Sequence, residues 1–109
     1  MGGVYDEKEL ATWRAWQLLE VSADKLVCDR PCFVAAVSLV PAAAGASDAY
    51  VYNGHDAGGE LKASLLSVTG DMIQERYAPP AYFNRGLYVD VDTNVQAVRI
   101  LLLVDPKGW

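Results

Sequence analysis

The chain has 109 residues, 52% of them apolar, which is enough to fill one hydrophobic core but not two, so we expect a single domain. Its net charge of −5, its pI near 4.6 and its nine scattered basic residues exclude a nucleic-acid phosphate backbone as the partner. No apolar run approaches the roughly 20 residues of a membrane span, so we expect a soluble protein without membrane contact. The start of the chain lacks the features of a secretory signal, and we expect synthesis in the cytoplasm without Sec export.

The first segment, residues 6–19, carries the signals of a helix. Asp6 can cap its start, and Glu9 follows three residues later as in a capping box. Large side chains then recur at helical spacing, at Leu10, Trp13 and Trp16 or Gln17. Residues 18–21 fit a strand equally well because they are apolar and partly β-branched. We expect a short N-terminal helix or arm over residues 1–15 that runs into the first strand.

Short strands separated by turn residues make up the rest of the chain. Glycine, proline and asparagine interrupt the apolar segments at intervals of about 8 to 12 residues, which is typical of an antiparallel sandwich. The expected strands are Lys25 to Cys28, Cys32 to Val40, a hairpin from Ala49 to Val68, Met72 to Tyr77, the segment Tyr82 to Val91, and Val95 to Val104. The sequence therefore predicts an all-β fold, a small antiparallel β-sandwich of jelly-roll type, over residues 16–109.

The joins between strands carry further predictions. Asn53 to Gly59 is a glycine-rich hairpin turn, and Asp92-Thr93-Asn94 is a tight turn that is expected to join the last two strands in the same way. Pro79-Pro80 cannot donate ladder hydrogen bonds. We therefore expect residues 78–81 to form a crossing connection between sheets or along an edge.

The cysteines Cys28 and Cys32 flank a turn at residues 29–31. A tetrahedral zinc site would need two further ligands, and the only histidine, His55, lies far away in sequence. The spacing is also wrong for a redox Cys-x-x-Cys motif. We interpret the pair as strand-end cysteines, and a disulfide between them is expected only if the protein works outside a reducing cell.

One acidic turn resembles the start of a calcium loop. Asp90, Asp92 and Asn94 alternate as in such a loop, but Val95 and Leu101 stand where the loop needs Gly and Glu. Alternation in a strand that buries its valines and exposes its aspartates explains the same pattern. A calcium ion in this turn or in residues 53–60 stays the alternative.

A hydrolase would require His55 to act as a base for a nucleophile such as Ser64 or Ser67. No third group that orients the histidine, and no oxyanion device, is recognisable in the sequence. A solvated histidine in a surface turn is the favoured interpretation. We expect a protein that is not an enzyme and that binds no cofactor and no metal.

The aromatic residues suggest two different uses. Flat rings can stack on sugars and so form a carbohydrate platform, but large rings are also enriched in cores and in contacts between subunits. We favour packing and subunit contact. The candidate interface residues are Trp13, Trp16, Tyr50, Tyr52, Tyr82, Phe83 and Trp109.

The order of several short motifs resembles a known group of proteins. The motifs are Val21-Ser22-Ala23-Asp24, Arg30-Pro31-Cys32, Tyr50-Val51-Tyr52-Asn53-Gly54, Asp56-Ala57-Gly58-Gly59-Glu60-Leu61 and Arg85-Gly86-Leu87-Tyr88-Val89-Asp90. Over roughly residues 16–104 they look like a group of small, uncharacterised β-sandwich proteins encoded among bacteriophage and prophage structural genes. The resemblance implies a β-sandwich and a virion context, without a position in the particle.

A virion component needs a rigid module, an arm that clasps neighbours and no active site, and the residues fit that description. We expect a capsid decoration (cement) or head-associated protein, made in the host cytoplasm and localised to the virion. Its expected partners are itself, in a homo-oligomer such as a trimer, and virion proteins such as the major capsid protein. The alternative is a carbohydrate- or ligand-binding β-sandwich module that uses exposed aromatics and the 53–60 loop.

Overall fold

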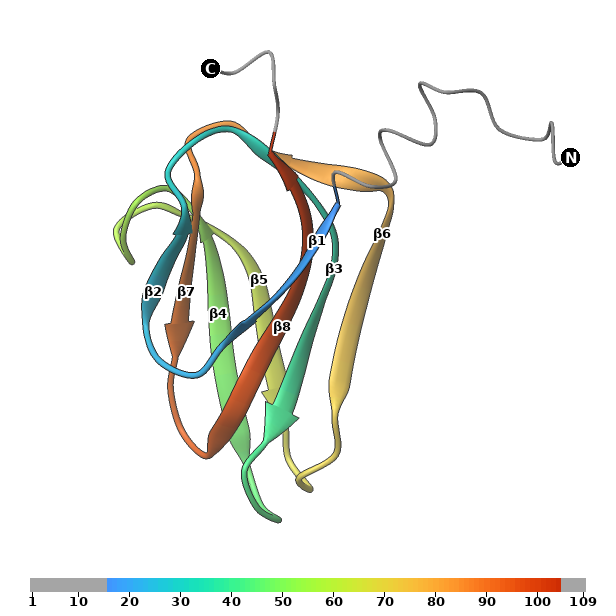
Figure 1. The fold of residues 1–109 in the computed structure, drawn as a ribbon. Coiled ribbons are helices and arrows are strands. Elements are labelled where there is room, and N and C mark those ends of the chain that lie inside the picture. The colour runs from blue at the N-terminus through green and yellow to red at the C-terminus, as the bar shows by residue number, and fades with distance from the viewer. Residues whose placement is uncertain (1–15, 105–109) are drawn as a thin grey trace, which may run out of the picture.

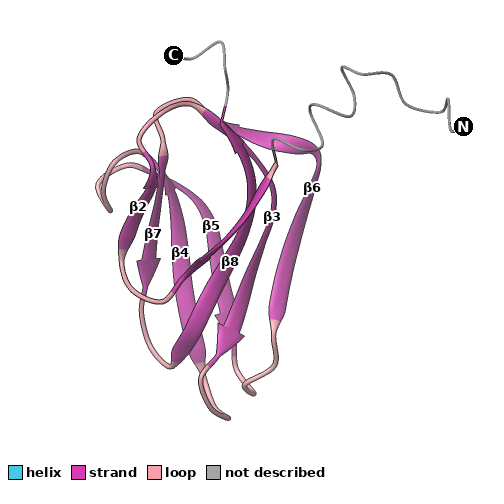
Figure 2. Cartoon of the chain, in the orientation of Figure 1, coloured by secondary structure: helices cyan, strands magenta, loops and turns pink. Residues whose placement is uncertain are grey.

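The computed structural model describes residues 16–104, and that range is all-β, without a helix (Figures 1 and 2). Eight strands form two four-stranded antiparallel sheets, which confirms the prediction of an all-β, antiparallel fold. The strands are β1 (Gln17–Val21), β2 (Lys25–Cys28), β3 (Cys32–Pro41), β4 (Ser47–Asn53), β5 (Glu60–Ser67), β6 (Ile73–Phe83), β7 (Leu87–Val91) and β8 (Val95–Val104). In this part of the chain there is no helix long and apolar enough to cross a membrane.

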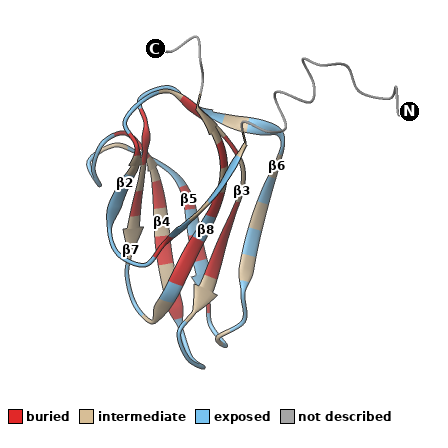
Figure 3. Cartoon of the chain, in the orientation of Figure 1, coloured by how far each residue is buried: buried red, intermediate tan, exposed pale blue. Residues whose placement is uncertain are grey.

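The strands pair from the outside of the sequence inward. Sheet A has the order β1-β8-β3-β6, and sheet B has the order β2-β7-β4-β5. The first strand therefore pairs with the eighth, the second with the seventh, the third with the sixth and the fourth with the fifth. Buried side chains from both sheets form one cluster, so the two sheets are layered as in a sandwich (Figure 3).

Alternation along each strand gives one face to the core and the other to the surface. In β4 the buried residues Ser47, Ala49, Val51 and Asn53 alternate with half-buried ones. Full burial of a Val, Leu, Ile or Phe side chain stabilises a fold by about 1.5–3 kcal/mol. The largest fully buried side chains are Phe83, Leu39, Leu65, Leu87, Ile100, Leu102, Val34, Val37, Val51, Val89 and Val98.

The turns lie at two opposite ends of the sandwich (Figure 1). One end holds the turns at residues 29–31, 54–59 and 84–86, and the other holds those at 22–24, 42–46, 68–72 and 92–94. The β4–β5 join is a true hairpin within sheet B, as predicted.

The join between the last two strands differs from the prediction. β7 lies in sheet B and β8 in sheet A, so the turn at residues 92–94 crosses from one sheet to the other and closes no hairpin. The turn is held by β4 instead. Asp48 Oδ1 accepts a hydrogen bond from the Thr93 N–H at 3.0 Å, and the Asp48 carbonyl accepts one from the Asp92 N–H at 3.2 Å. Asn94 adopts a φ of 56°, which makes the tight reversal possible.

The proline pair lies in the edge strand β6, which confirms the predicted position along an edge, whereas the predictions that one strand ends at Tyr77 and the next begins at Tyr82 are wrong. β6 runs from Ile73 to Phe83 at the edge of sheet A, and residues 78–81 do not cross between the sheets. The register against β3 shifts from Val34–Ala81 to Ala36–Arg76, so β6 bulges where the prolines stand. An edge strand tolerates proline because one side of it needs no ladder partner, and a bulge there blocks further strand pairing.

The strand that was expected to follow the N-terminal segment, at residues 18–21, is confirmed as β1. Gln17, Leu18 and Leu19 belong to β1, which pairs with β8, and Leu19 packs against the core from a position opposite Ile100. Because one face of β1 is buried in the sandwich, tertiary packing outweighs the helical spacing of residues 17–19. The predicted arm, residues 1–15, lies outside the described residues.

Candidate functional site

Large apolar side chains are exposed on both sheets of the sandwich. The exposed fractions are 70% for Leu18, 57% for Met72 and 45% for Tyr82 on or beside sheet A, and 37% for Leu26, 51% for Leu61 and 57% for Leu66 on sheet B. Single exposed apolar residues are ordinary, whereas contiguous ones mark contact sites. The strand register decides which of these residues are neighbours.

On sheet B, the register aligns outward side chains across all four strands. Leu26 lies opposite Tyr88, Tyr88 opposite Tyr52, and Tyr52 opposite Leu61. The rings of Tyr52 and Tyr88 form a tilted pair with centroids 6.4 Å apart, which is within the range of a favourable aromatic contact. Tyr50 follows on the same face of β4. We call these five residues the tyrosine face.

Aspartates border the tyrosine face. Asp90 lies opposite Tyr50 in the register, and Asp48 Oδ2 accepts a hydrogen bond from the Tyr50 hydroxyl at 2.8 Å. Asp24 accepts a hydrogen bond from a backbone N–H at the end of β7 at 2.7 Å, and Asp92 follows in the next turn. Burial raises the pKa of Asp90, and the carboxylates of Asp24, Asp92 and Asp48 raise it further. The neighbouring carboxylates thus add to the effect of burial and make this border of the face negative.

The same carboxylates act on the tyrosine hydroxyls. The pKa of Tyr50 is raised, first by its hydrogen bond to Asp48, and the pKa of Tyr88 is raised, first by burial and then by neighbouring aspartates. No lysine or arginine occupies a described position in the outward rows that contain these tyrosines. Lys62, at the bulge in β5, forms an ion pair with Glu60 at 3.3 Å. The tyrosine face is therefore apolar along its centre and negative at its border.

Sheet A carries a second apolar surface on its outer side. Phe33 lies opposite both Leu103 and Tyr82, and the rings of Phe33 and Tyr82 have centroids 4.9 Å apart. Continuing the register of β1 by one residue places the half-buried Trp16 opposite Leu103.

The next row of sheet A continues this surface. Leu101 lies opposite both Leu18 and Ala36, and the small side chain of Ala36 leaves a shallow groove of about 230 Å³ between Leu18, Leu101 and Met72. We call the surface the leucine face, and it consists of Trp16, Leu18, Phe33, Tyr82, Leu101 and Leu103.

A polar row borders the leucine face. Arg99 Nε donates to Glu20 Oε2 at 3.2 Å, and Arg76 Nε donates to the Gln74 side-chain oxygen at 3.1 Å. A guanidinium has five N–H donors, so these bonds leave both arginines with donors for further acceptors. Arg99 lies in the polar row, whereas Arg76 lies opposite Ala36 at the end of the apolar row, so the two arginines and one glutamate leave a positive charge beside the face.

The predicted interface residues fall into three groups. Trp16 and Tyr82 belong to the leucine face, whereas Tyr50 and Tyr52 belong to the tyrosine face on the other side of the sandwich. Phe83 is only 1% exposed and lies in the core, because it is the inward-pointing residue opposite Cys32, which corrects its assignment as an interface residue. Trp13 and Trp109 lie outside the described residues.

Several members of the two faces were missed because each is ordinary in its own strand. Leu26 and Leu61 are isolated leucines in the sequence, Leu18 is one of a leucine pair, and Phe33 and Tyr88 follow the alternation of their strands. Only the cross-strand register makes them neighbours. The alternation could have placed them on outward faces, but it could not have supplied the register.

The glycine-rich loop singled out in the sequence has a structural role. Asn53 is buried, and its Nδ2 donates to Asn84 Oδ1 at 2.7 Å while its Oδ1 accepts from the Arg85 N–H at 2.9 Å. The Gly54 N–H donates to the Gly86 carbonyl at 3.3 Å. These bonds join the 54–59 loop to the 84–86 turn.

The histidine of this loop does not meet the serines proposed as nucleophiles. His55 is exposed in an open pocket of about 480 Å³ that contains no serine in its lining. Ser64 points outward opposite Tyr50, and Ser67 is buried at the far end of β5. The pocket is lined by Gly54, His55, Asp56, Gly58, Gly59 and Arg85.

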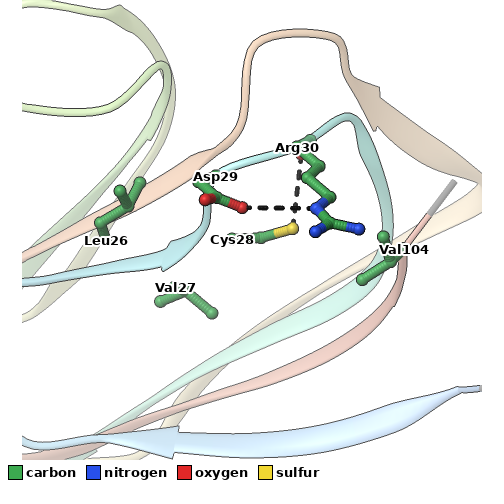
Figure 4. Close-up of a pocket in the computed structure, with 6 residues that line it drawn as sticks. All are labelled: Leu26, Val27, Cys28, Asp29, Arg30 and Val104. Atoms are coloured by element: carbon green, nitrogen blue, oxygen red, sulfur yellow. Dashed lines mark hydrogen bonds and ion pairs between the residues drawn. The ribbon is translucent and has the colours of Figure 1, made fainter. Parts of the chain in front are cut away.

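A second pocket lies beside the cysteine turn (Figure 4). It has a volume of about 330 Å³ and extends from Leu26 to Val104. Cys28 Sγ donates a hydrogen bond to the Arg30 carbonyl at 3.4 Å, so these two pocket-lining residues are hydrogen-bonded to each other. Cys28 and Cys32 are both buried free thiols, and burial together with the neighbouring Cys28 raises the pKa of Cys32 to about 12. A protonated thiol is a poor nucleophile and a poor metal ligand.

Within residues 16–104, no group of three or more His, Cys, Asp and Glu side chains is placed to hold a metal ion. No protein-family model matches the chain, and searches of the curated proteins and of the solved structures find no match either. The candidate functional site is therefore the pair of outer faces, whose chemistry suits contact with another macromolecule.

Proposed function

We propose that this chain is a non-enzymatic structural protein of a phage-type virion, most plausibly a capsid decoration (cement) or head-associated protein. The observation that carries the proposal is the apolar leucine face on a sheet that nothing in the described chain covers. Exposed contiguous apolar side chains are costly in a protein that works alone and useful in one that docks permanently. The resemblance to proteins of phage structural genes supplies the virion context.

We further propose that the sandwich is a jelly roll. In a jelly roll, a long hairpin of four strand pairs folds over to give two four-stranded sheets, and viral capsid and lectin domains both use this fold. The pairing of β1 with β8, β2 with β7, β3 with β6 and β4 with β5 supports this assignment.

The proposed partners are other copies of the chain and virion proteins such as the major capsid protein, with the leucine face and residues 1–15 making contacts to the particle. The protein would be made in the host cytoplasm and then localise to the virion. Neither nucleic acid nor membrane is part of the proposal, since the net charge of −5 opposes binding to phosphates.

Co-sedimentation with virus particles from the organism that encodes the chain tests this function. We expect the full chain to pellet with particles, and we expect Leu18→Asp to reduce pelleting strongly because it puts a charge in the middle of the leucine face. Val68→Asp, which puts the same charge at an exposed apolar position outside the leucine face, is the matched control and should bind normally. A wild-type chain that stays in the supernatant would contradict the proposal.

A carbohydrate-binding module is the second candidate, and the tyrosine face favours it specifically. Rings at Tyr52 and Tyr88 beside carboxylates at Asp48 and Asp90 could combine stacking with hydrogen bonds to sugar hydroxyls. A glycan array with the wild-type chain and Tyr52→Ala tests this use. Binding that is lost in Tyr52→Ala, together with no particle binding, would favour the second candidate over the first.

A further inference from the structure

The two outer faces of the sandwich have matching apolar centres and opposite charge. Across sheet B, Leu26, Tyr88, Tyr52 and Leu61 form a continuous row. Across sheet A, Leu18, Leu101 and Ala36 form a comparable row. Both rows run perpendicular to the strands and extend over three or four of them, so either could lie on the other with apolar side chains in register.

The charges beside these rows are complementary. The border of the tyrosine face holds Asp24, Asp48, Asp90 and Asp92. Beside the leucine face, Arg99 lies in the next row and is paired with Glu20, and Arg76 ends the apolar row on the edge strand β6. Arginine is suited to this role because its planar group binds carboxylates bidentately and stacks on tyrosine rings.

We propose that the tyrosine face of one copy of this chain packs on the leucine face of a second copy. The proposal rests on the homo-oligomer in the proposed function, and it names the two surfaces that would form it. With the apolar rows in register, the Arg99 guanidinium of one copy lies one row away and approaches the Asp90 carboxylate of the next, while Arg76 approaches the edge of the tyrosine face from the end of the apolar row.

Charge excludes the two symmetric alternatives. A tyrosine face against another tyrosine face would bring eight aspartates into one contact, and a leucine face against another would bring together four arginines with two glutamates. Like charges in a contact are strongly unfavourable. The contact is therefore head-to-tail, and such contacts continue as a stack whose last copy keeps its leucine face free for the particle.

The size of the faces predicts a weak contact. Four strands about 4.8 Å apart and about seven residues long at 3.3 Å each give roughly 440 Å² of flat area on each copy. Two such faces together bury roughly 900 Å², which is at the low end for specific contacts. We expect reversible association at micromolar concentrations, strengthened where many copies gather, as on a particle.

Charge reversal on the full chain, without particles, tests the inference. One variant, Asp90→Lys with Asp92→Lys, makes the border of the tyrosine face positive, and the other, Arg76→Glu with Arg99→Glu, makes that of the leucine face negative. We expect sedimentation velocity at up to about 200 μM to show association of the wild type. Each variant alone should be monomeric, and an equimolar mixture should associate again, because every contact in the mixture joins opposite charges.

Several outcomes would overturn the inference. These are a wild type that stays monomeric, a variant that associates as the wild type does, or a mixture of two folded variants that does not associate. If a charge variant fails to fold, Leu61→Ser interrupts the tyrosine face at a half-exposed position and must reduce association at least about tenfold, a difference of 1.4 kcal/mol. Added salt should also weaken the contact.

The outcome is separable from that of the proposed function. A monomeric chain that pellets with particles would overturn the head-to-tail contact and leave the virion role standing. A chain that self-associates but does not bind particles would overturn the virion role and leave the head-to-tail contact standing.

Discussion

Replacement of Asn53 by alanine should unfold the turn end of the sandwich at a much lower temperature than the wild type. The buried amide makes two short bonds, to Asn84 Oδ1 at 2.7 Å and from the Arg85 N–H at 2.9 Å, and its Nδ2 also approaches Glu60 Oε1 at 3.4 Å. Each lost bond costs about 1 kcal/mol, and a backbone N–H left without an acceptor adds about 1–2 kcal/mol. The sum is about 3–4 kcal/mol, or about 12–20 °C in Tm for a domain near this size.

Thermal and urea unfolding of the full chain measure this difference, with circular dichroism as the signal. Asn84→Ala is the matched control, because it removes only the bond to Asn53 Nδ2 and should cost about 1 kcal/mol. Equal losses in the two variants, or a loss below about 1 kcal/mol for Asn53→Ala, would refute the role given to the buried amide.

Four further predictions concern single residues. Gly86→Ala should lower the free energy of unfolding by about 2–3 kcal/mol, because Gly86 has a φ of +136° and an added Cβ would lie 2.7 Å from the Cys28 carbonyl oxygen. A urea unfolding curve that matches the wild type would contradict this prediction. Ser47→Ala should raise stability by up to about 1 kcal/mol, since the buried Ser47 hydroxyl has no hydrogen-bond partner among the described residues, and a clear fall in Tm would count against it. Because the pKa of Asp90 is raised, the folded state holds the Asp90 proton more tightly than the unfolded state, and the contribution of Asp90 to stability declines as pH rises above the ordinary value of 3.8. Asp90→Asn should therefore be more stable than the wild type at pH 7, and the difference should close below about pH 4. A difference in stability that stays constant with pH would argue against this cause. Cys32, with a pKa of about 12, should resist iodoacetamide at pH 8 in the folded chain and react after unfolding, as followed by intact mass, and rapid labelling in the native state would show that its burial is wrong.

The sequence predicts the strands of this fold better than their arrangement. β2, β4, β5 and β8 could be located because each has an alternating or continuous apolar pattern bounded by turn residues. The sequence does not reveal the sheet to which each strand belongs. The turn at Asp92 to Asn94 has the composition of a hairpin turn, but its backbone groups bond to Asp48 and Ala42, which lie far away in sequence.

The strand end predicted at Tyr77 is wrong for a related reason. Local rules exclude Pro79 and Pro80 from a central strand, and they leave open an edge strand with a bulge, which is what β6 is. Residues 17–19 have helical spacing, yet they pair with β8 because burial of Leu19 and Val21 in the core outweighs local propensity.

The candidate faces could be predicted only in part. Tyr50 and Tyr52 stand out because they alternate on one strand, so an outward aromatic pair was foreseeable. Their neighbours Tyr88, Leu26 and Leu61 come from three other strands, and only the register brings them alongside. Phe83 shows the opposite error, since a residue next to the outward Tyr82 must point inward.

Quantitative mass spectrometry of purified virus particles from the organism that encodes this chain tests the proposed virion role most directly. The account predicts that the chain is present in a fixed molar ratio to the major capsid protein and that it stays with the particles through a density gradient. Particles that lack the chain, while the infected or induced cells contain it in soluble form, would contradict the account.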